Sequence, residues 1–107
     1  MSKSIKVISS KEEVEAFLHD LISVLNRSDF DRNDVLHQLM SLVVSEYLET
    51  FIDDKDPSWP PFFVFARSIK RRDIYIKVKI RDRVKGKVFC VSFHFARHPF
   101  PDTLPYA

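Results

Sequence analysis

The chain has 107 residues, the size of one domain, because two separate cores would each be too small to be stable. Hydrophobic residues make up 45% and Phe occurs ten times, so the composition favours one compact core rich in rings and argues against disorder. A single glycine, Gly86, excludes Gly-rich phosphate-binding loops, and a single cysteine, Cys90, excludes an internal disulfide.

Charge is distributed unevenly, although the formal net charge is only +2. Residues 1–56 carry six Lys and Arg against twelve Asp and Glu, whereas residues 57–107 carry eleven against three. Such a basic half is typical of a surface for a polyanion or an acidic protein partner, although two such halves can also neutralise each other within one fold. The N-terminus lacks the apolar run of a signal peptide, and no stretch is long enough to span a membrane, which predicts a cytoplasmic protein.

The N-terminal half predicts helices. Ser10 and Glu13 have the spacing of a capping box at a helix start. Apolar residues then recur every three or four positions over 11–26, which predicts an amphipathic helix with one buried stripe: Val14, Phe17, Leu18, Leu21, Ile22 and Leu25. The same spacing predicts a second helix over 33–43, and residues 45–51 either extend it or form a short third helix.

The second half predicts a loop and three strands. The stretch 52–61 is acidic and contains prolines, which predicts a loop because proline interrupts both helices and ladders. The hydrophobic period then changes to two, and we expect strands over 62–69, 73–81 and 87–95, joined by short polar loops into an antiparallel meander. Residues 96–107 contain three prolines and predict an irregular tail.

These elements together predict a single α+β domain over 1–107. Its helical part, at about 10–51, should pack on one face of a three-stranded sheet. Alternation along the strands assigns the side that faces the helices to Ile74, Ile76, Val78, Ile80, Phe89, Val91, Phe93 and Phe95. The opposite, solvent-facing side is assigned to Tyr75, Lys77, Lys79, Arg81, Cys90, Ser92 and His94, with Arg67 added from the first strand.

The predicted solvent face has the groups needed for phosphodiester chemistry without a metal. Cleavage of RNA by its own 2′-hydroxyl needs an acid, a base and cations. His94 is the candidate acid or base, since imidazole changes its charge near neutral pH, and Tyr75 is a candidate hydrogen-bond donor or base platform. The residues expected to hold phosphate or RNA are Lys77, Lys79, Arg67, Arg81 and Ser92. A cationic outer face also commonly keeps a sheet soluble, and this simpler interpretation stays open. The histidines and the single cysteine lack the spacing of a zinc site, so no metal or cofactor is expected.

Two short segments resemble a known family. Tyr-Ile-Lys-Val-Lys at 75–79 and Cys-Val-Ser-Phe-His at 90–94 resemble the MqsR family of type II toxins, and the likeness spans about residues 33–98. The resemblance implies a RelE-like fold and ribosome-independent cleavage of mRNA without metal. It also implies a cognate antitoxin protein, often a repressor with zinc-finger and helix-turn-helix parts.

The resemblance also assigns residues. It implies that Tyr75 is the active-site tyrosine and that His94 stands where the family has a lysine. Glu49 stands near the position of another family lysine, and Phe62 near that of a glutamine. The sequence therefore predicts a toxin-like endoribonuclease. The alternative is a non-catalytic binding module whose basic sheet face engages RNA or an acidic protein partner.

Overall fold

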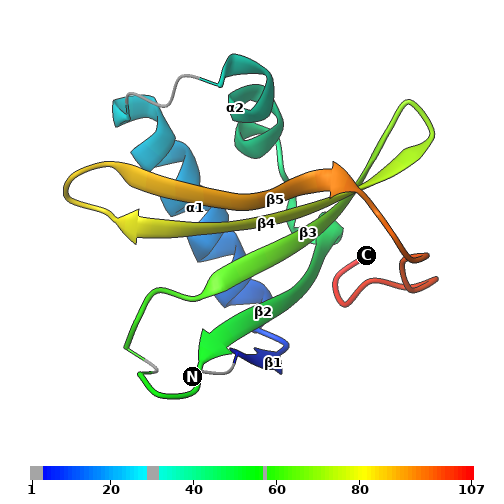
Figure 1. Ribbon diagram of the computed structural model, residues 1–107, viewed down its shortest axis with the longest axis horizontal. Helices are drawn as coiled ribbons and strands as arrows, with labels where there is room; N and C mark the ends of the chain where they lie inside the picture. Colours follow the sequence, from blue (N-terminus) through cyan, green and yellow to red (C-terminus); the bar gives the residue numbers. More distant parts are fainter. Residues whose placement is uncertain (1–3, 29–31, 57) are drawn as a thin grey trace.

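The computed structural model describes residues 4–28, 32–56 and 58–107, and these form two helices on one face of a five-stranded antiparallel sheet (Figure 1). In chain order the elements are β1 (Ser4–Val7), α1 (Lys11–Arg27), α2 (Asn33–Met40), the 3-10 helix η1 (Val44–Glu46), β2 (Tyr47–Asp53), β3 (Phe62–Ile69), β4 (Arg72–Asp82) and β5 (Lys87–Phe95). The strands are hydrogen-bonded in the order β1-β2-β3-β4-β5, each antiparallel to its neighbour. The predicted α+β class is confirmed.

Helix α1 begins as the sequence predicts. The Ser10 hydroxyl accepts a hydrogen bond from the Glu13 N–H at 3.1 Å, and the Glu13 carboxylate accepts one from the Ser10 N–H at 3.2 Å. The buried stripe of α1 differs at one position, because Val24 faces the core whereas Ile22 is 38% exposed. At 3.6 residues per turn, Ile22 falls at the edge of the stripe.

The core lies between the helices and the sheet. Ile74, Ile76 and Val78 of β4 are 6%, 0% and 0% exposed, so the prediction that the helices cover this face is confirmed. The ring of Phe17 from α1 stacks on Phe63 of β3 at 4.0 Å between centroids. The face of the sheet that points away from the helices is called the open face below.

The three predicted strands pair antiparallel in the predicted order as β3, β4 and β5, but the prediction that the sheet has three strands is wrong, because β1 and β2 add two strands at one edge. Most of the stretch 45–51 is not helical: η1 ends at Glu46, and residues 47–51 belong to β2, which pairs with β3. The second helix ends at Met40 and not at residue 43. Strand β2 continues to Asp53, which leaves the predicted loop only from residue 54.

Long-range hydrogen bonds explain why β2 is a strand. Its Tyr47 hydroxyl accepts from the Ser9 N–H at 2.8 Å and shares a hydrogen with the Thr50 hydroxyl at 2.6 Å. Thr50 in turn bonds to the Ser9 hydroxyl at 2.7 Å. Tyr47 is fully buried, so this network replaces water for groups that the core would otherwise leave unsatisfied. Contacts to residues nearly forty positions away override the local preference for helix.

A bulge in β2 sets which side chains face the cavity described below. Tyr47 pairs with Phe65, but Glu49 pairs with Val64, so the register shifts by one residue at Leu48. Residues two apart in a regular strand share a face. The extra residue puts Tyr47 in the core and Glu49 on the open face.

A second bulge changes the predicted faces of β5. Lys77 of β4 pairs with Ser92, whereas the next residue, Val78, pairs with Cys90. Phe89 consequently lies opposite Lys79 on the open face and is 43% exposed, so its predicted place in the core is wrong.

The rest of β5 follows the predicted alternation. Phe93 packs against the core as predicted, and the side chains of Cys90 and Val91 lie outside the described part of the chain. Phe95 pairs with Ile74 on the helix side but is 52% exposed, which corrects its predicted burial. It lies beyond the cover of the helices, and the Arg72 guanidinium stacks over its ring at 3.8 Å.

The β3–β4 turn and the C-terminal segment complete the fold. Lys70 and Arg71 make a two-residue turn at φ 52° and 66°, the left-handed region that such hairpin turns require. Residues 96–107 contain no helix or strand, as predicted. Tyr106 anchors this segment, because its ring stacks on Tyr47 at 5.7 Å and its hydroxyl donates to the Ser9 carbonyl. None of the described helices is long and apolar enough to cross a membrane.

Candidate functional site

The two predicted catalytic residues meet on the open face. Tyr75 of β4 and His94 of β5 are direct cross-strand partners, and their rings stack at 5.4 Å between centroids with an angle of 14°. They lie in a cavity of about 540 Å³ whose walls come from β1, β2 and the C-terminal segment. The residues that line it are Lys6, Leu48, Glu49, Tyr75, His94, Ala96, Arg97, His98, Pro99, Phe100 and Pro101.

The His94 ring is fixed in a way that suits proton transfer. Its Nδ1 lies 2.8 Å from the Phe95 carbonyl oxygen. A carbonyl can only accept, so Nδ1 carries the hydrogen and donates it. In the neutral ring this leaves Nε2 as the acceptor, on an exposed side chain at the cavity. The stacked Tyr75 ring restrains the same imidazole from one side.

The Tyr75 hydroxyl stays a donor in this environment. Burial, and secondly the negative charge of Glu49, raise the pKa of the Tyr75 phenol above its usual value. Glu49 reaches the cavity from β2 and pairs with the Lys6 ammonium of β1 at 3.8 Å. The Glu49 side chain is 17% exposed and that of Lys6 is 64% exposed. Tyr75 is therefore a neutral hydrogen-bond donor at the cavity wall.

The C-terminal segment adds charge from the other side. It turns beside the open face after β5, where Arg97 and His98 line the cavity and are exposed. The cavity thus combines two histidines, a tyrosine and an arginine with the Lys6–Glu49 pair. Within the residues that the structure describes, no three His, Cys, Asp or Glu side chains gather where they could hold a metal ion.

The other predicted RNA-binding residues share the open face with the cavity, with one exception. Lys77 and Lys79 follow Tyr75 along the open face of β4, and Ser92 pairs with Lys77 from β5. Arg81 is exposed, with its guanidinium carbon 5.6 Å from the centre of the Phe89 ring. These four residues and the Tyr75–His94 pair occupy one face, as predicted.

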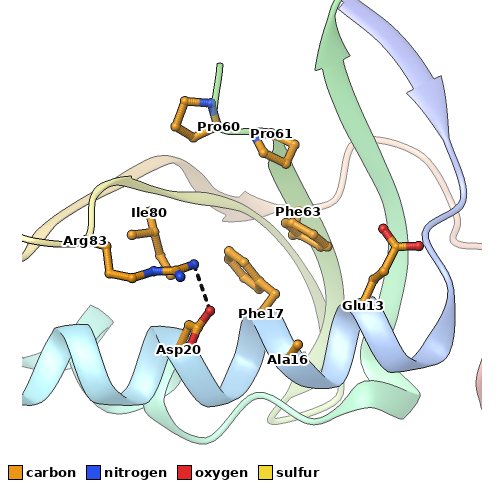
Figure 2. A pocket seen from close by; sticks show the side chains of 9 residues that line it. All are labelled: Glu13, Ala16, Phe17, Asp20, Pro60, Pro61, Phe63, Ile80 and Arg83. Carbon is orange, nitrogen blue, oxygen red and sulfur yellow. Dashed lines mark ion pairs between the residues drawn. The ribbon is translucent and has the colours of Figure 1, made fainter. Parts of the chain in front are cut away.

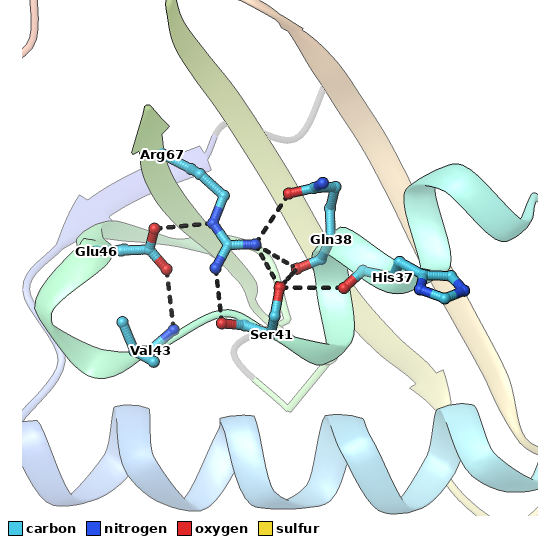
Figure 3. Close-up of polar contacts among 6 residues, drawn as sticks. All are labelled: His37, Gln38, Ser41, Val43, Glu46 and Arg67. Atoms are coloured by element: carbon cyan, nitrogen blue, oxygen red, sulfur yellow. Dashed lines mark hydrogen bonds and ion pairs between the residues drawn. The ribbon is translucent and has the colours of Figure 1, made fainter. Parts of the chain in front are cut away.

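Arg67 is the exception, because its predicted place on the open face is wrong. It pairs with Ile74, which faces the helices, so the Arg67 side chain also points toward the helices and away from the open face. Figure 3 shows its guanidinium enclosed by the end of α2 and by η1. It donates to the Glu46 carboxylate at 2.9 Å, to the Gln38 carbonyl at 3.0 Å and to the Ser41 carbonyl at 2.7 Å. Arg67 joins α2 and η1 to the sheet.

Four charged or ionisable residues of the cavity were not predicted as site residues. Glu49 was noted only as a departure from the family pattern, and its place at the cavity depends on the β2 bulge. Lys6 lies on a strand too short to give a periodic signal. Arg97 and His98 lie in an irregular segment, where no pattern fixes the direction of a side chain. Their sequence signal is only that both are polar and follow His94 closely.

A second cavity, of about 560 Å³, lies between α1 and the strands β3 and β4 (Figure 2). Its floor contains the stacked rings of Phe17 and Phe63. Asp20 at its rim is already paired with Arg83 at 2.8 Å, and the Glu13 carboxylate caps α1. Since its charged groups are engaged, this cavity offers less for acid–base chemistry than the Tyr75–His94 cavity.

Comparison of the chain with protein-family models, with curated proteins and with solved structures finds no match.

Proposed function

We propose that this chain is an endoribonuclease that cleaves RNA without a metal ion in the Tyr75–His94 cavity. The observation that carries the proposal is the meeting of Tyr75, His94, Arg97 and His98 in one cavity beside a basic sheet face. Attack of a 2′-hydroxyl on the neighbouring phosphorus requires a base, an acid and positive charge, and these four side chains supply them.

In the proposed reaction His94 is the base. Its Nε2 takes the proton of the 2′-hydroxyl, while Nδ1 keeps its bond to the Phe95 carbonyl. The 2′-oxygen forms a bond to phosphorus and the bond to the 5′-oxygen breaks. His98, in its protonated form, gives a proton to that leaving oxygen. The products are a 2′,3′-cyclic phosphate and a 5′-hydroxyl.

Tyr75 and Arg97 stabilise the charge that develops on phosphorus. The Tyr75 hydroxyl stays protonated and donates a hydrogen bond, and Arg97 supplies a fixed positive charge. Glu49 does not share a proton with His94, because β2 and β5 are three strand spacings apart, about 14 Å between backbones. The Lys6–Glu49 pair instead faces the sugar or base of the bound nucleotide.

The test is cleavage of a labelled single-stranded RNA by the purified chain, with identification of the new ends. We expect a cyclic phosphate end, no effect of a chelator, and no cut at a position whose 2′-hydroxyl is replaced by hydrogen. His94→Ala should lower the rate by about a hundredfold or more, the usual contribution of a positioned acid or base. With both an acid and a base in the step, the rate should pass through a maximum as pH is varied.

The matched control is His37→Ala, which removes an exposed histidine from α2 and should leave the rate unchanged. Equal cleavage by the His94 variant and the wild type would show that a contaminating nuclease or another site is responsible. If the wild type binds RNA and leaves it intact, the chain is a binding module and the enzyme proposal fails.

The toxin role is a further part of the proposal, and it is supported by the resemblance of segments 75–79 and 90–94 to MqsR-type toxins. Expression of the chain in growing bacteria should arrest growth, and His94→Ala should relieve the arrest. A cognate antitoxin should restore growth when it is expressed together with the active chain. Normal growth with the unaltered, soluble chain present would contradict this part alone.

A further inference from the structure

A row of phenyl rings crosses the open face next to the cavity. Phe51 of β2 pairs with Phe62 of β3, and Lys79 of β4 pairs with Phe89 of β5. The Lys79 ammonium lies 4.5 Å from the centre of the Phe62 ring, which joins the two pairs. The row therefore spans four neighbouring strands, on the face that the helices leave uncovered.

Cations lie over these rings. The Lys77 ammonium is 4.4 Å from the Phe51 ring centre and 5.1 Å from that of Phe62. Arg81 approaches Phe89 in the same way. Lys77 and Lys79 thus lie on the open face beside the rings, where their ammonium groups can meet an anion.

We propose that this row is a stacking track for single-stranded RNA, separate from the cavity in which the bond is broken. The track consists of Phe51, Phe62 and Phe89 with Lys77, Lys79 and Arg81. Aromatic rings stack on the faces of unpaired bases. The flexible Lys77 and Lys79 side chains, which lie over the Phe51 and Phe62 rings in the free protein, move from the rings to the phosphates when RNA binds. A duplex hides its base faces, so the track selects single strands. The proposal rests on the proposed function in taking RNA as the ligand.

The dimensions of the sheet set the length of RNA that the track and cavity hold together. Four neighbouring strands span about 14 Å, room for about four stacked nucleotides. Tyr75 and Lys79 lie four residues apart on β4, which places the cavity about 13 Å from the row. An RNA of about eight nucleotides therefore reaches both, at the 3.4 Å spacing of a stacked strand.

The experiment measures binding of a fluorescent oligouridine of about eight nucleotides, a length that follows from the spacing above. It carries 2′-O-methyl groups, so that cleavage is impossible and binding is read alone. Phe62→Leu and Phe89→Leu keep an apolar side chain and remove the ring. Each should weaken binding by about tenfold, the effect of losing one stacked base. A duplex of equal length should bind at least about tenfold more weakly than the single strand.

The matched control is Phe95→Leu. Phe95 is also an exposed ring under a guanidinium, but its register places it on the helix side of the sheet. Its variant should bind the oligonucleotide like the wild type. Phe89 is exposed, so its variant should stay folded even if Phe62→Leu disturbs the sheet, and circular dichroism checks both.

Three results would overturn the track: unchanged affinity in Phe89→Leu, equal binding of duplex and single strand, or no binding by the wild type. Ring-dependent binding of a polyglutamate peptide in place of RNA would also overturn it and would assign the face to an acidic protein. Ring-dependent RNA binding without any cleavage by the wild type would leave the track standing and remove the proposed function. Cleavage by the wild type together with binding that does not depend on the rings would support the proposed function and remove the track.

Discussion

Replacing Arg67 by methionine distinguishes a residue that holds the fold from one that holds RNA. The Arg67 and Glu46 side chains are only 15% and 20% exposed. Breaking a buried ion pair costs about 3–5 kcal/mol, because the remaining charge loses its partner. The Glu46 carboxylate keeps its hydrogen bond from the Val43 N–H and some contact with water. We therefore expect a loss of about 2–3 kcal/mol in the free energy of unfolding.

A loss of this size is easy to measure in a domain of 107 residues. Each kcal/mol corresponds to about 4–8 °C, so the melting temperature of Arg67→Met should fall by about 10–20 °C in thermal unfolding followed by circular dichroism. Arg81→Met is the control: it removes an exposed arginine from the open face and should change stability by about 0.5 kcal/mol or less.

The order of the two variants should be reversed when RNA affinity is measured in place of stability. At a temperature where both variants are folded, Arg67→Met should bind single-stranded RNA like the wild type, and Arg81→Met should bind it more weakly. An Arg67 variant with an unchanged melting temperature and lost RNA affinity would refute the structural role derived from its hydrogen bonds.

Three further predictions concern stability. Tyr47→Phe should lower the free energy of unfolding by about 1–3 kcal/mol in chemical denaturation, because the buried Ser9 N–H loses its acceptor, and an unchanged midpoint would contradict this. Arg71→Gly should raise the free energy of unfolding by about 0.5–1 kcal/mol, since glycine adopts the φ of 66° without strain, and a lower urea midpoint would argue against it. Burial raises the pKa of Tyr75, so the folded state holds the phenol proton more tightly than the unfolded state does. The difference in the free energy of unfolding between the wild type and Tyr75→Phe should therefore be constant below about pH 10 and decline above it. A difference that rises with alkaline pH would contradict the assigned direction.

Local signals account for the parts of the fold that the sequence predicted. The capping box and the apolar stripe after Ser10 define α1, and strict alternation around Ile76 defines β4. Neighbouring strands joined by short loops must pair, which brought Tyr75 beside His94.

The parts that were missed depend on contacts distant in sequence. Tyr47 is a strand residue because Phe65 and Ser9 surround it, and neither lies near it in the chain. The bulges carry no composition signal, so the faces of Glu49 and Phe89 follow only from the observed pairing. Hydrophobic periodicity along a strand cannot reveal a bulge, so it assigns the wrong face to the residues beyond the bulge.

The β2 bulge lets one strand carry an extra residue without exchanging its two faces. Loss of Leu48 would make Tyr47 the direct neighbour of Glu49, and regular alternation would keep Tyr47 in the core and Glu49 on the open face. The hydrogen bonds of Tyr47 and the acidic wall of the cavity would both survive such a deletion, and the cavity would lose only the Leu48 side chain that lines it. Deletion of Tyr47 or Glu49 in place of Leu48 would remove one of these features, so an alignment that closes the gap at the wrong position would compare side chains from opposite faces.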